Sequence, residues 1–123
     1  MTCFGGVRLA QVHPDLRALV LDVSTSTDVV VVQGARSLED EERAIAYGKS
    51  ALRDPAASKH VLTSTRTLAE AVDVAPFPVE WSNISRFYSL ASLMFARASA
   101  LSVNLTWGGH WLHLKDFDHF ELA

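Results

Sequence analysis

The stretch from Ser85 to Leu101 repeats its apolar residues at the spacing of one face of a helix. The apolar positions of this repeat are Phe87, Leu90, Ala91, Met94, Ala98 and Leu101. A long helix with one apolar face needs a partner surface to cover that face. We therefore expect this stretch to be a helix that packs on a second layer, which the flanking segments must supply.

Two segments before this helix are predicted to be short strands. Residues 28–34 (DVVVVQG) contain consecutive valines, and this short β-branched run favours a buried strand that ends at the glycine. Residues 69–77 (AEAVDVAPF) alternate around Val72 and Val74 and predict a second strand, which Pro76 ends.

Two more strands are predicted after the helix. Residues 103–107 (VNLTW) and residues 118–122 (DHFEL) have the pattern of short strands, and Gly108 and Gly109 provide the turn after the first of them. Because helices alternate with short strands and the C-terminal half is rich in strands, the pattern indicates an α+β fold.

Two further helices are predicted in the N-terminal half. Pro14 fits the first turn of a short helix, with His13 at its beginning. Ser37 fits the N-cap of a second helix with an acidic first turn, and Gly48 fits its C-terminal stop. Residues 49–67 are irregular and rich in Ser and Thr, so we expect them to be mostly loop.

Length and composition indicate one globular domain. The chain has 123 residues, enough to bury a core, and its 49% hydrophobic and 20% charged residues argue against disorder. No internal repeat, low-complexity tract or Pro/Gly-rich linker divides the sequence. We therefore expect a single α+β domain over residues 1–123, with helices packed on a short antiparallel sheet.

Charge, cysteine content and hydropathy exclude several function classes. The formal net charge is −3 and no Lys/Arg block is present, which argues against nucleic-acid binding through phosphates. Cys3 is the only cysteine, so neither an internal disulfide nor a Cys-based zinc cluster can form. The sequence also lacks a long apolar run and a basic-then-apolar N-terminus, so we expect neither a membrane span nor a secretory signal.

Four residues are candidates for chemistry: His60, Asp73, Asp116 and His119. Two imidazoles and one carboxylate are a common shell for a catalytic zinc ion, with a fourth position left for water. A further carboxylate beside that water can act first as general base and then as general acid. The same residue types are common in cores and on surfaces, so residue type alone leaves both interpretations open.

The segments around these residues resemble one enzyme family. The matching segments, in chain order, are VHPDL, VVQGARS, SKH (58–60), AVDVAP (71–76), LTWGG (105–109) and KDFDHFEL (115–122). In them the chain resembles the small zinc L-alanyl-D-glutamate peptidases of phage lysis systems, relatives of the D-alanyl-D-alanine carboxypeptidases. The resemblance covers nearly the whole chain and implies the hedgehog-type, D-Ala-D-Ala peptidase-like fold with a zinc site.

The resemblance assigns roles to individual residues. It implies that Zn²⁺ is bound by His60 in a Ser-x-His motif, by Asp73 in an Ala-x-Asp motif and by His119 before Phe-Glu-Leu. It also implies that Asp116, three residues before the last ligand, is the catalytic carboxylate.

Arg36 lies in a Gly-Ala-Arg-Ser turn, where the family typically has a catalytic-site arginine. Such an arginine can hold a carboxylate or support the polarised carbonyl through its planar fork. An ion pair with Glu39 or Asp40 at the start of the next helix is the structural alternative, and the sequence does not choose between the two.

Two features depart from the family pattern. Twelve residues separate His60 from Asp73 where six are usual, so residues 64–69 (STRTLA) have the character of an insertion. We expect this segment to bulge and leave the two ligands close together, and its removal to preserve zinc binding, because loop-closure entropy rises slowly with length. His110 replaces an acidic residue of the family and forms an H-x-x-H pair with His113, which offers too few ligands for a second metal site.

Other aromatic and acidic residues are expected to have structural roles. The aromatic residues expected in the core, rather than on a sugar-stacking surface, are Trp81, Phe87, Tyr88, Phe95 and Trp107. Glu121 is expected to face away from His119 and to have a supporting role.

The resemblance implies metal-assisted hydrolysis of the L-Ala–D-Glu bond in the stem peptide of peptidoglycan. Asp116 would take the proton of the attacking water and pass it to the leaving amine, while Arg36 or the metal stabilises the oxyanion. Two alternatives remain: a carboxypeptidase that removes a terminal D-Ala, and a catalytically inactive relative that binds wall peptide. We further expect a monomeric lysin without a signal peptide, made in the host cytoplasm and released to the cell wall during lysis.

Overall fold

The computed structural model describes residues 1–46, 57–112 and 115–123. The elements in chain order are β1 (Cys3–Phe4), η1 (Gly6–Leu9), α1 (Pro14–Val23), β2 (Val29–Gln33), α2 (Leu38–Ala46), β3 (Ala71–Pro76), α3 (Ile84–Ala100), β4 (Leu105–Trp107), η3 (Gly108–His110) and β5 (His119–Leu122). Helices and short strands alternate along the chain, which confirms the α+β prediction.

The sheet has five strands in the order β1-β2-β3-β5-β4. Every pairing among β2, β3, β5 and β4 is antiparallel, as expected. β1 is not predicted from the sequence, and it pairs with β2 in parallel, so this edge departs from the antiparallel arrangement. The parallel pairing follows from the connection, because α1 lies between the two strands in sequence and provides the crossover that parallel neighbours need.

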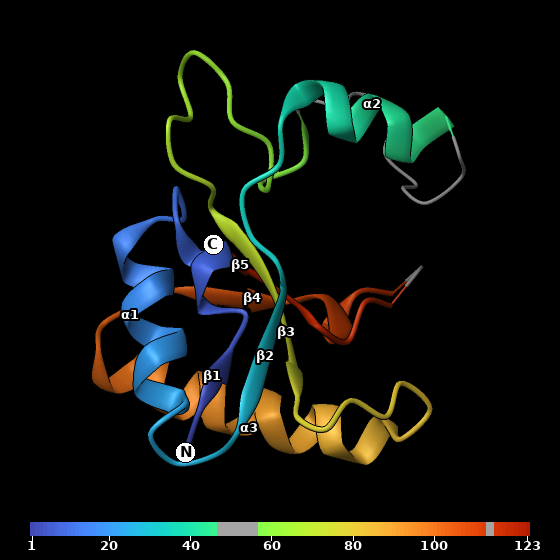
Figure 1. Ribbon diagram of the computed structural model, residues 1–123. Helices are drawn as coiled ribbons and strands as arrows, with labels where there is room; N and C mark the ends of the chain where they lie inside the picture. The colour runs from blue at the N-terminus through green and yellow to red at the C-terminus, as the bar shows by residue number, and fades with distance from the viewer. Residues whose placement is uncertain (47–56, 113–114) are drawn as a thin grey trace.

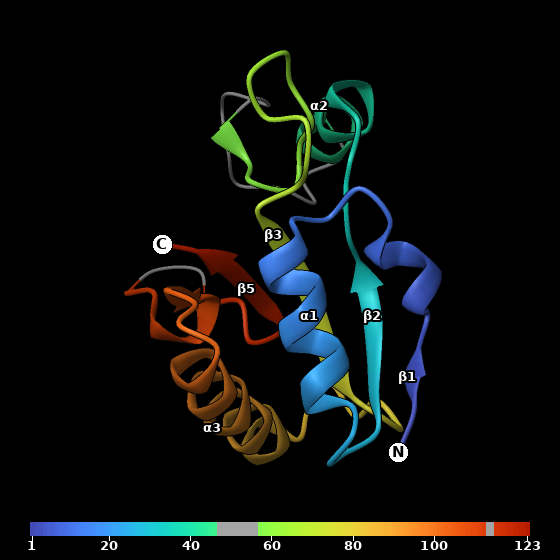
Figure 2. The same cartoon turned by 90° about the vertical axis from the view of Figure 1, so that its left-hand side faces the viewer.

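The helix predicted from the apolar repeat is α3, and it packs on the sheet beside α1 (Figure 2). Its buried residues are Phe87, Leu90, Ala91, Met94 and Ala98. Leu101, the last apolar residue of the repeat, lies beyond the final helical turn and is exposed. No helix in the described part of the chain is long and apolar enough to cross a membrane.

Two helices begin with the caps that the sequence predicts. At the start of α1, His13 Nδ1 accepts a hydrogen bond from the Asp15 amide at 3.1 Å. At the start of α2, Ser37 Oγ accepts one from the Asp40 amide at 3.1 Å. The predicted stop of this second helix, Gly48, lies outside the described residues.

α2 lies beyond one end of the sheet, next to the loop that leads into β3 (Figure 1). The described part of the predicted loop, residues 57–67, contains no α-helix or extended strand, as expected. A single bridge between Arg36 and Val61 joins this loop to the segment before α2. α2 and the described part of this loop therefore lie together at one end of the sheet (Figure 1).

The aromatic residues divide between the core and the surface. Phe87 and Trp107 are buried as predicted, and Phe95 packs against the core from its edge. Trp81 and Tyr88 are 59% and 48% exposed, so their assignment to the core is wrong. Trp81 lies before α3 rather than on its apolar face, and Tyr88, one residue after Phe87, is turned away from that face by the helical rotation.

Candidate metal centre and active site

Two of the predicted ligands face each other across neighbouring strands. Asp73 in β3 is in register with His119 in β5. Their neighbours Val72 and Phe120 belong to the core beneath α1 and α3. Because successive strand residues alternate between faces, Asp73 and His119 project from the opposite face of the sheet. Their side chains meet there, with His119 Nδ1 3.1 Å from Asp73 Oδ1.

His60 reaches the same point from the loop before β3. Its Nε2 lies 3.2 Å from Asp73 Oδ1 and 3.2 Å from His119 Nδ1. Both histidines are buried, at 4% and 7% exposure. The structure thus brings all three predicted ligands together, and the expectation that residues 64–69 leave His60 close to Asp73 is confirmed.

The three donor atoms, which we call the donor triangle, are His60 Nε2, Asp73 Oδ1 and His119 Nδ1. The edges of the triangle measure 3.1, 3.2 and 3.2 Å. Zinc bonds of about 2.0–2.1 Å at tetrahedral angles place ligand atoms about 3.3 Å apart. The donor triangle therefore fits zinc, and among the described residues it offers three protein donors, the number that a catalytic site provides.

Hydrogen bonds orient both imidazole rings toward the donor triangle. His60 Nδ1 lies 2.8 Å from the Gly34 carbonyl oxygen, so it donates there and leaves Nε2 for a metal. His119 Nε2 lies 2.8 Å from Glu121 Oε1, which leaves Nδ1 for a metal. Position 34 must be glycine, because a Cβ there would lie 1.9 Å from the Arg8 carbonyl oxygen.

The expectation that Glu121 faces away from His119 is wrong. Residues two apart in a strand project from the same face, so both belong to the face that holds the donor triangle. Glu121 is partly buried, and its other oxygen, Oε2, lies 3.1 Å from Lys59 Nζ. Its expected supporting role is consistent with these contacts.

The protonation of the site follows from these contacts. Burial alone would raise the pKa of Asp73, but hydrogen bonds and charges from His119 and His60 outweigh it and hold the pKa below its usual range. Burial alone would lower the pKa of His119, but hydrogen bonds with Asp73 and Glu121 raise it to about 9. In zinc-free protein His119 therefore keeps a proton at neutral pH, and a bound metal would replace the proton on Nδ1.

Asp116 lies beside the donor triangle without being part of it. Its carboxylate is within 4.8 Å of those of Asp73 and Asp118. The main chain at Asp116 packs against Gly108, whose carbonyl oxygen accepts a hydrogen bond from the Asp116 amide at 3.1 Å. A Cβ on Gly108 would lie 2.3 Å from the Asp116 carbonyl oxygen and 3.1 Å from His119 Cβ. The glycine of the Trp-Gly-Gly turn therefore allows the segment with the candidate proton carrier to approach the site.

Asp118 belongs to the same cluster and was not singled out from the sequence. Burial, a hydrogen bond with Asp116 and the negative charges of Asp73 and Asp116 raise the pKa of Asp118 to about 9. A carboxyl group with this pKa holds its proton at neutral pH and can donate a hydrogen bond to the Asp116 carboxylate. The only sequence signal for this residue is its place between the candidate acid and the last ligand.

Arg36 is bound to α2 by its side chain and to the His60 loop by its main chain. Its guanidinium forms an ion pair with Glu41, whose side chain is 1% exposed. The helix ion pair considered from the sequence therefore exists, with Glu41 rather than Glu39 or Asp40 as the partner. The Arg36 amide donates to the His60 carbonyl oxygen at 2.7 Å. Arg36 thus fixes the loop that positions one of the histidines.

The segment of residues 64–69 is integrated into the fold. Arg66 Nη1 donates to the Ser58 carbonyl at 2.9 Å and to the Val61 carbonyl at 3.3 Å, so it ties the two sides of the His60 loop together. Ala69 is fully buried and forms a bridge with the segment before α1. These contacts argue against the expectation that removal of the segment preserves zinc binding.

His110, which replaces an acidic residue of the family pattern, packs among aromatic rings. It stacks on Phe95 with ring centroids 5.6 Å apart and meets Trp107 edge-on at 5.0 Å. These contacts support a structural role. Its predicted H-x-x-H partner, His113, lies outside the described residues.

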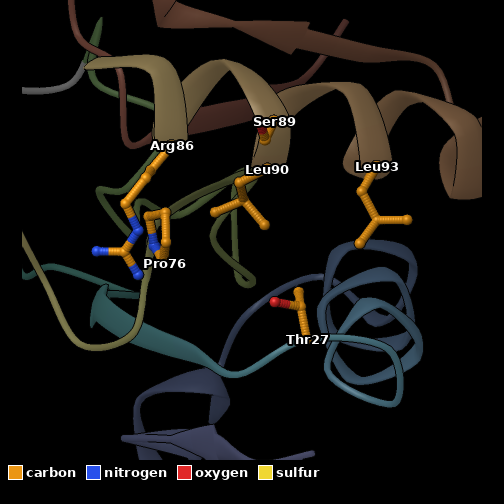
Figure 3. Close-up of a pocket in the computed structure, with 6 residues that line it drawn as sticks. All are labelled: Thr27, Pro76, Arg86, Ser89, Leu90 and Leu93. Carbon is orange, nitrogen blue, oxygen red and sulfur yellow. The ribbon is translucent and has the colours of Figure 1, made fainter. Parts of the chain in front are cut away.

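A hollow of about 260 Å³ lies between α3 and the end of β3 (Figure 3). Its lining residues are Thr27, Pro76, Arg86, Ser89, Leu90 and Leu93. The lining contains no member of the donor triangle, so we treat the hollow as separate from the candidate site.

The chain is similar to known proteins in both sequence and structure. The chain matches, over residues 5–121, the family described as phage L-alanyl-D-glutamate peptidase. An L-alanyl-D-glutamate peptidase of Escherichia phage T5 is 29% identical over 121 residues, which cover 94% of this chain and 82% of that protein. The crystal structure of the Serratia marcescens L-Ala D-Glu endopeptidase ChiX matches with a TM-score of 0.79 and 26% identity, covering 99% of this chain and 90% of that one. The chain therefore belongs to the phage L-alanyl-D-glutamate peptidase family.

Proposed function

We propose that the protein is a zinc-dependent peptidoglycan peptidase that hydrolyses the L-Ala–D-Glu bond of the stem peptide. The observation that supports this most strongly is the donor triangle, found in a chain that belongs to a peptidase family. Two similar proteins are named for the L-Ala–D-Glu bond, which favours this bond over the terminal D-Ala–D-Ala bond.

In this proposal His60, Asp73 and His119 hold the zinc ion. Zinc bound there would supply Lewis-acid activation of the attacking water and of the scissile carbonyl. Asp116 would accept a proton from that water and deliver it to the leaving amine, because its carboxylate lies beside Asp73 and outside the donor triangle. Asp118 would hold the Asp116 carboxylate in place by hydrogen bonding.

We assign Arg36 to binding of a substrate carboxylate or to support of the polarised carbonyl oxygen. Its ion pair with Glu41 orients the guanidinium, and its main-chain hydrogen bond to the His60 carbonyl joins its backbone to the loop that bears one of the proposed ligands. A planar guanidinium held in this way suits carboxylate and carbonyl recognition better than a flexible lysine.

We also propose where and in what form the protein acts. Family membership supports a phage lysin that is made in the host cytoplasm and reaches the cell wall during lysis. The stem peptide is its partner, and we expect it to act as a monomer, which light scattering of the purified protein would test. The net charge of −3 is consistent with the absence of a nucleic-acid partner.

The test is digestion of soluble wall fragments that carry an intact stem peptide, with the products identified by mass. The zinc-loaded protein should release a peptide that begins with D-Glu and leave L-Ala attached to the sugar. A chelator should stop the reaction, and added zinc should restore it. Release of a single D-Ala would identify a carboxypeptidase instead, and binding without any product would identify an inactive wall-peptide-binding relative.

A further inference from the structure

The charged side chains of Glu121 and Lys59 connect the His119 ring to the loop that bears His60. Glu121 Oε1 lies 2.8 Å from His119 Nε2, and Glu121 Oε2 lies 3.1 Å from Lys59 Nζ. The same ammonium group donates to the Leu122 carbonyl oxygen. Lys59 directly precedes His60 in the sequence. These contacts therefore join the loop that bears one histidine to the strand that bears the other.

This series of contacts is partly shielded from water and anchored at both ends. The side chains of Lys59 and Glu121 are 30% and 20% exposed, and that of His119 is 9% exposed. Glu121 lies on β5, and the main chain of Lys59 is held by the Glu70 amide, which donates to its carbonyl oxygen at 2.8 Å. Screening and loss of side-chain entropy weaken such a pair less than a pair on the open surface.

An ion pair on α2 provides the comparison. Arg43 Nη2 lies 2.7 Å from Glu39 Oε1, but the two side chains are 61% and 74% exposed, and such a pair contributes little. The two pairs are alike in charge and in distance. They differ in their relation to the donor triangle. Glu121 also accepts a hydrogen bond from Nε2 of His119, a proposed zinc ligand, whereas Glu39, within the described part of the chain, has no such contact with the triangle.

We propose that Glu121 is a positioning residue for the zinc site and that Lys59 holds Glu121 in place. Glu121 accepts the Nε2–H of His119 and turns the ring so that Nδ1 faces the other two donors of the triangle. Lys59 engages the second carboxylate oxygen and prevents the carboxylate from rotating away. The inference rests on the proposed function in taking zinc as the metal of the donor triangle.

The expected effects on zinc affinity are graded. Glu121→Leu removes both the acceptor and the charge, and loss of such a carboxylate–histidine contact commonly weakens metal binding about 10- to 100-fold. Glu121→Gln keeps an acceptor oxygen but loses the charge, so a smaller loss of about 3- to 10-fold is expected. Lys59→Met removes only the outer group and should weaken binding about 3-fold.

Zinc affinity is measured by competition with a chromophoric chelator on the full chain, with no substrate present. Thermal unfolding of each variant in excess chelator reports the stability of the zinc-free fold, which a purely structural role would lower in step with affinity. Glu39→Gln, which breaks the exposed pair on α2, is the matched control and should bind zinc like the wild type. Lys59→Met should add no further loss in the Glu121→Leu background, because Lys59 acts through Glu121.

Unchanged zinc affinity in Glu121→Leu would overturn the inference, as would a loss of affinity fully matched by a loss of zinc-free stability. If Glu121→Leu does not fold, Glu121→Gln and Lys59→Met decide the question by the same two measurements. A wild-type protein that binds no zinc would refute the proposed function itself. If the wild type binds zinc and cleaves wall fragments, but the Glu121 and Lys59 variants bind zinc as tightly as the wild type, only this inference is refuted and the proposed function stands.

Discussion

Asp73 and His119 lie on two paired strands, whereas His60 lies on a loop. The strand donors are placed by the backbone register of β3 and β5, in which the two residues are direct partners. The loop donor is placed by contacts from elsewhere in the chain: the Arg36 amide donates to the His60 carbonyl at 2.7 Å, and the Leu62 amide donates to the Arg36 carbonyl at 3.0 Å. One half of the site therefore depends on sheet geometry and the other on tertiary contacts.

The two halves should respond differently to mutation. A sheet register leaves little room for adjustment, so loss of a strand donor should remove the metal completely. The contacts that hold the loop can be removed singly, so their loss should weaken the site in steps. The predictions below test this difference, from the largest expected effect to the smallest.

Replacement of the strand donor should have the largest effect. We expect the purified wild type to contain about one zinc per chain and His119→Ala to contain almost none, because two remaining donors do not make a stable site. Metal content is measured by atomic emission on the purified proteins. His110→Ala, which removes a histidine outside the donor triangle, is the control and should keep its zinc. Full zinc content in His119→Ala would show that the donor assignment is wrong.

Substitution of Asp116 should affect hydrolysis without affecting zinc binding. Asp116→Asn should keep its zinc but lose hydrolysis by a factor on the order of 10² or more, because the amide cannot carry the proton to the leaving amine. Rates on wall fragments and metal content are measured on the same preparation. Loss of zinc together with activity would instead make Asp116 part of the metal site.

The strand half should also give the zinc-free protein a characteristic pH dependence. The pKa of His119 is about 9 in the folded chain and about 6.5 when unfolded, so the folded state binds the proton more tightly. The stability from this proton is complete below pH about 6.5 and is lost as the pH rises toward 9, on the order of 3 kcal/mol. Asp118, whose pKa is also raised to about 9, acts in the same direction.

Chemical denaturation of the zinc-free protein at a series of pH values measures this change. His119→Gln is the control, and it should keep only the part of the slope that belongs to Asp118. A stability that stays constant or increases between pH 6.5 and 9 would contradict the assigned contacts.

The loop half should respond in a graded way. Arg66→Met removes hydrogen bonds to the Ser58 and Val61 carbonyls and should lower the free energy of unfolding by about 1–2 kcal/mol. Zinc affinity should fall modestly, with the metal content retained at saturating zinc. Deletion of residues 64–69 should have a larger effect than the single change, because it also removes the buried Ala69. Wild-type zinc affinity and stability in the deletion variant would show that the segment is dispensable after all.

Local sequence patterns predicted most of the fold. The apolar repeat predicted α3, because a helix that buries one face repeats its apolar residues every three to four positions. The valine run predicted β2, because a short run of β-branched residues is typical of a buried strand. β1 was missed because a strand of two residues, Cys3–Phe4, has no pattern of its own and exists only through its pairing with β2.

The errors occur where a residue's neighbours, and not its type, decide its environment. Trp81 and Tyr88 are large and aromatic, yet they lie off the buried face of α3 and are exposed. The side of β5 on which Glu121 lies could have been predicted, because residues two apart share a face. The raised pKa of Asp118 could not, because it depends on burial and on the approach of Asp116 and Asp73.

The sequence by itself determined the family resemblance, the candidate donors His60, Asp73 and His119, and the glycines at which two of the strands end. Only the tertiary structure decided that His60 meets His119 and that Lys59 reaches Glu121. The physical reason is distance along the chain. A periodic pattern reports which face of its own element is buried, whereas these contacts depend on how the loop before β3 is laid against the end of the sheet.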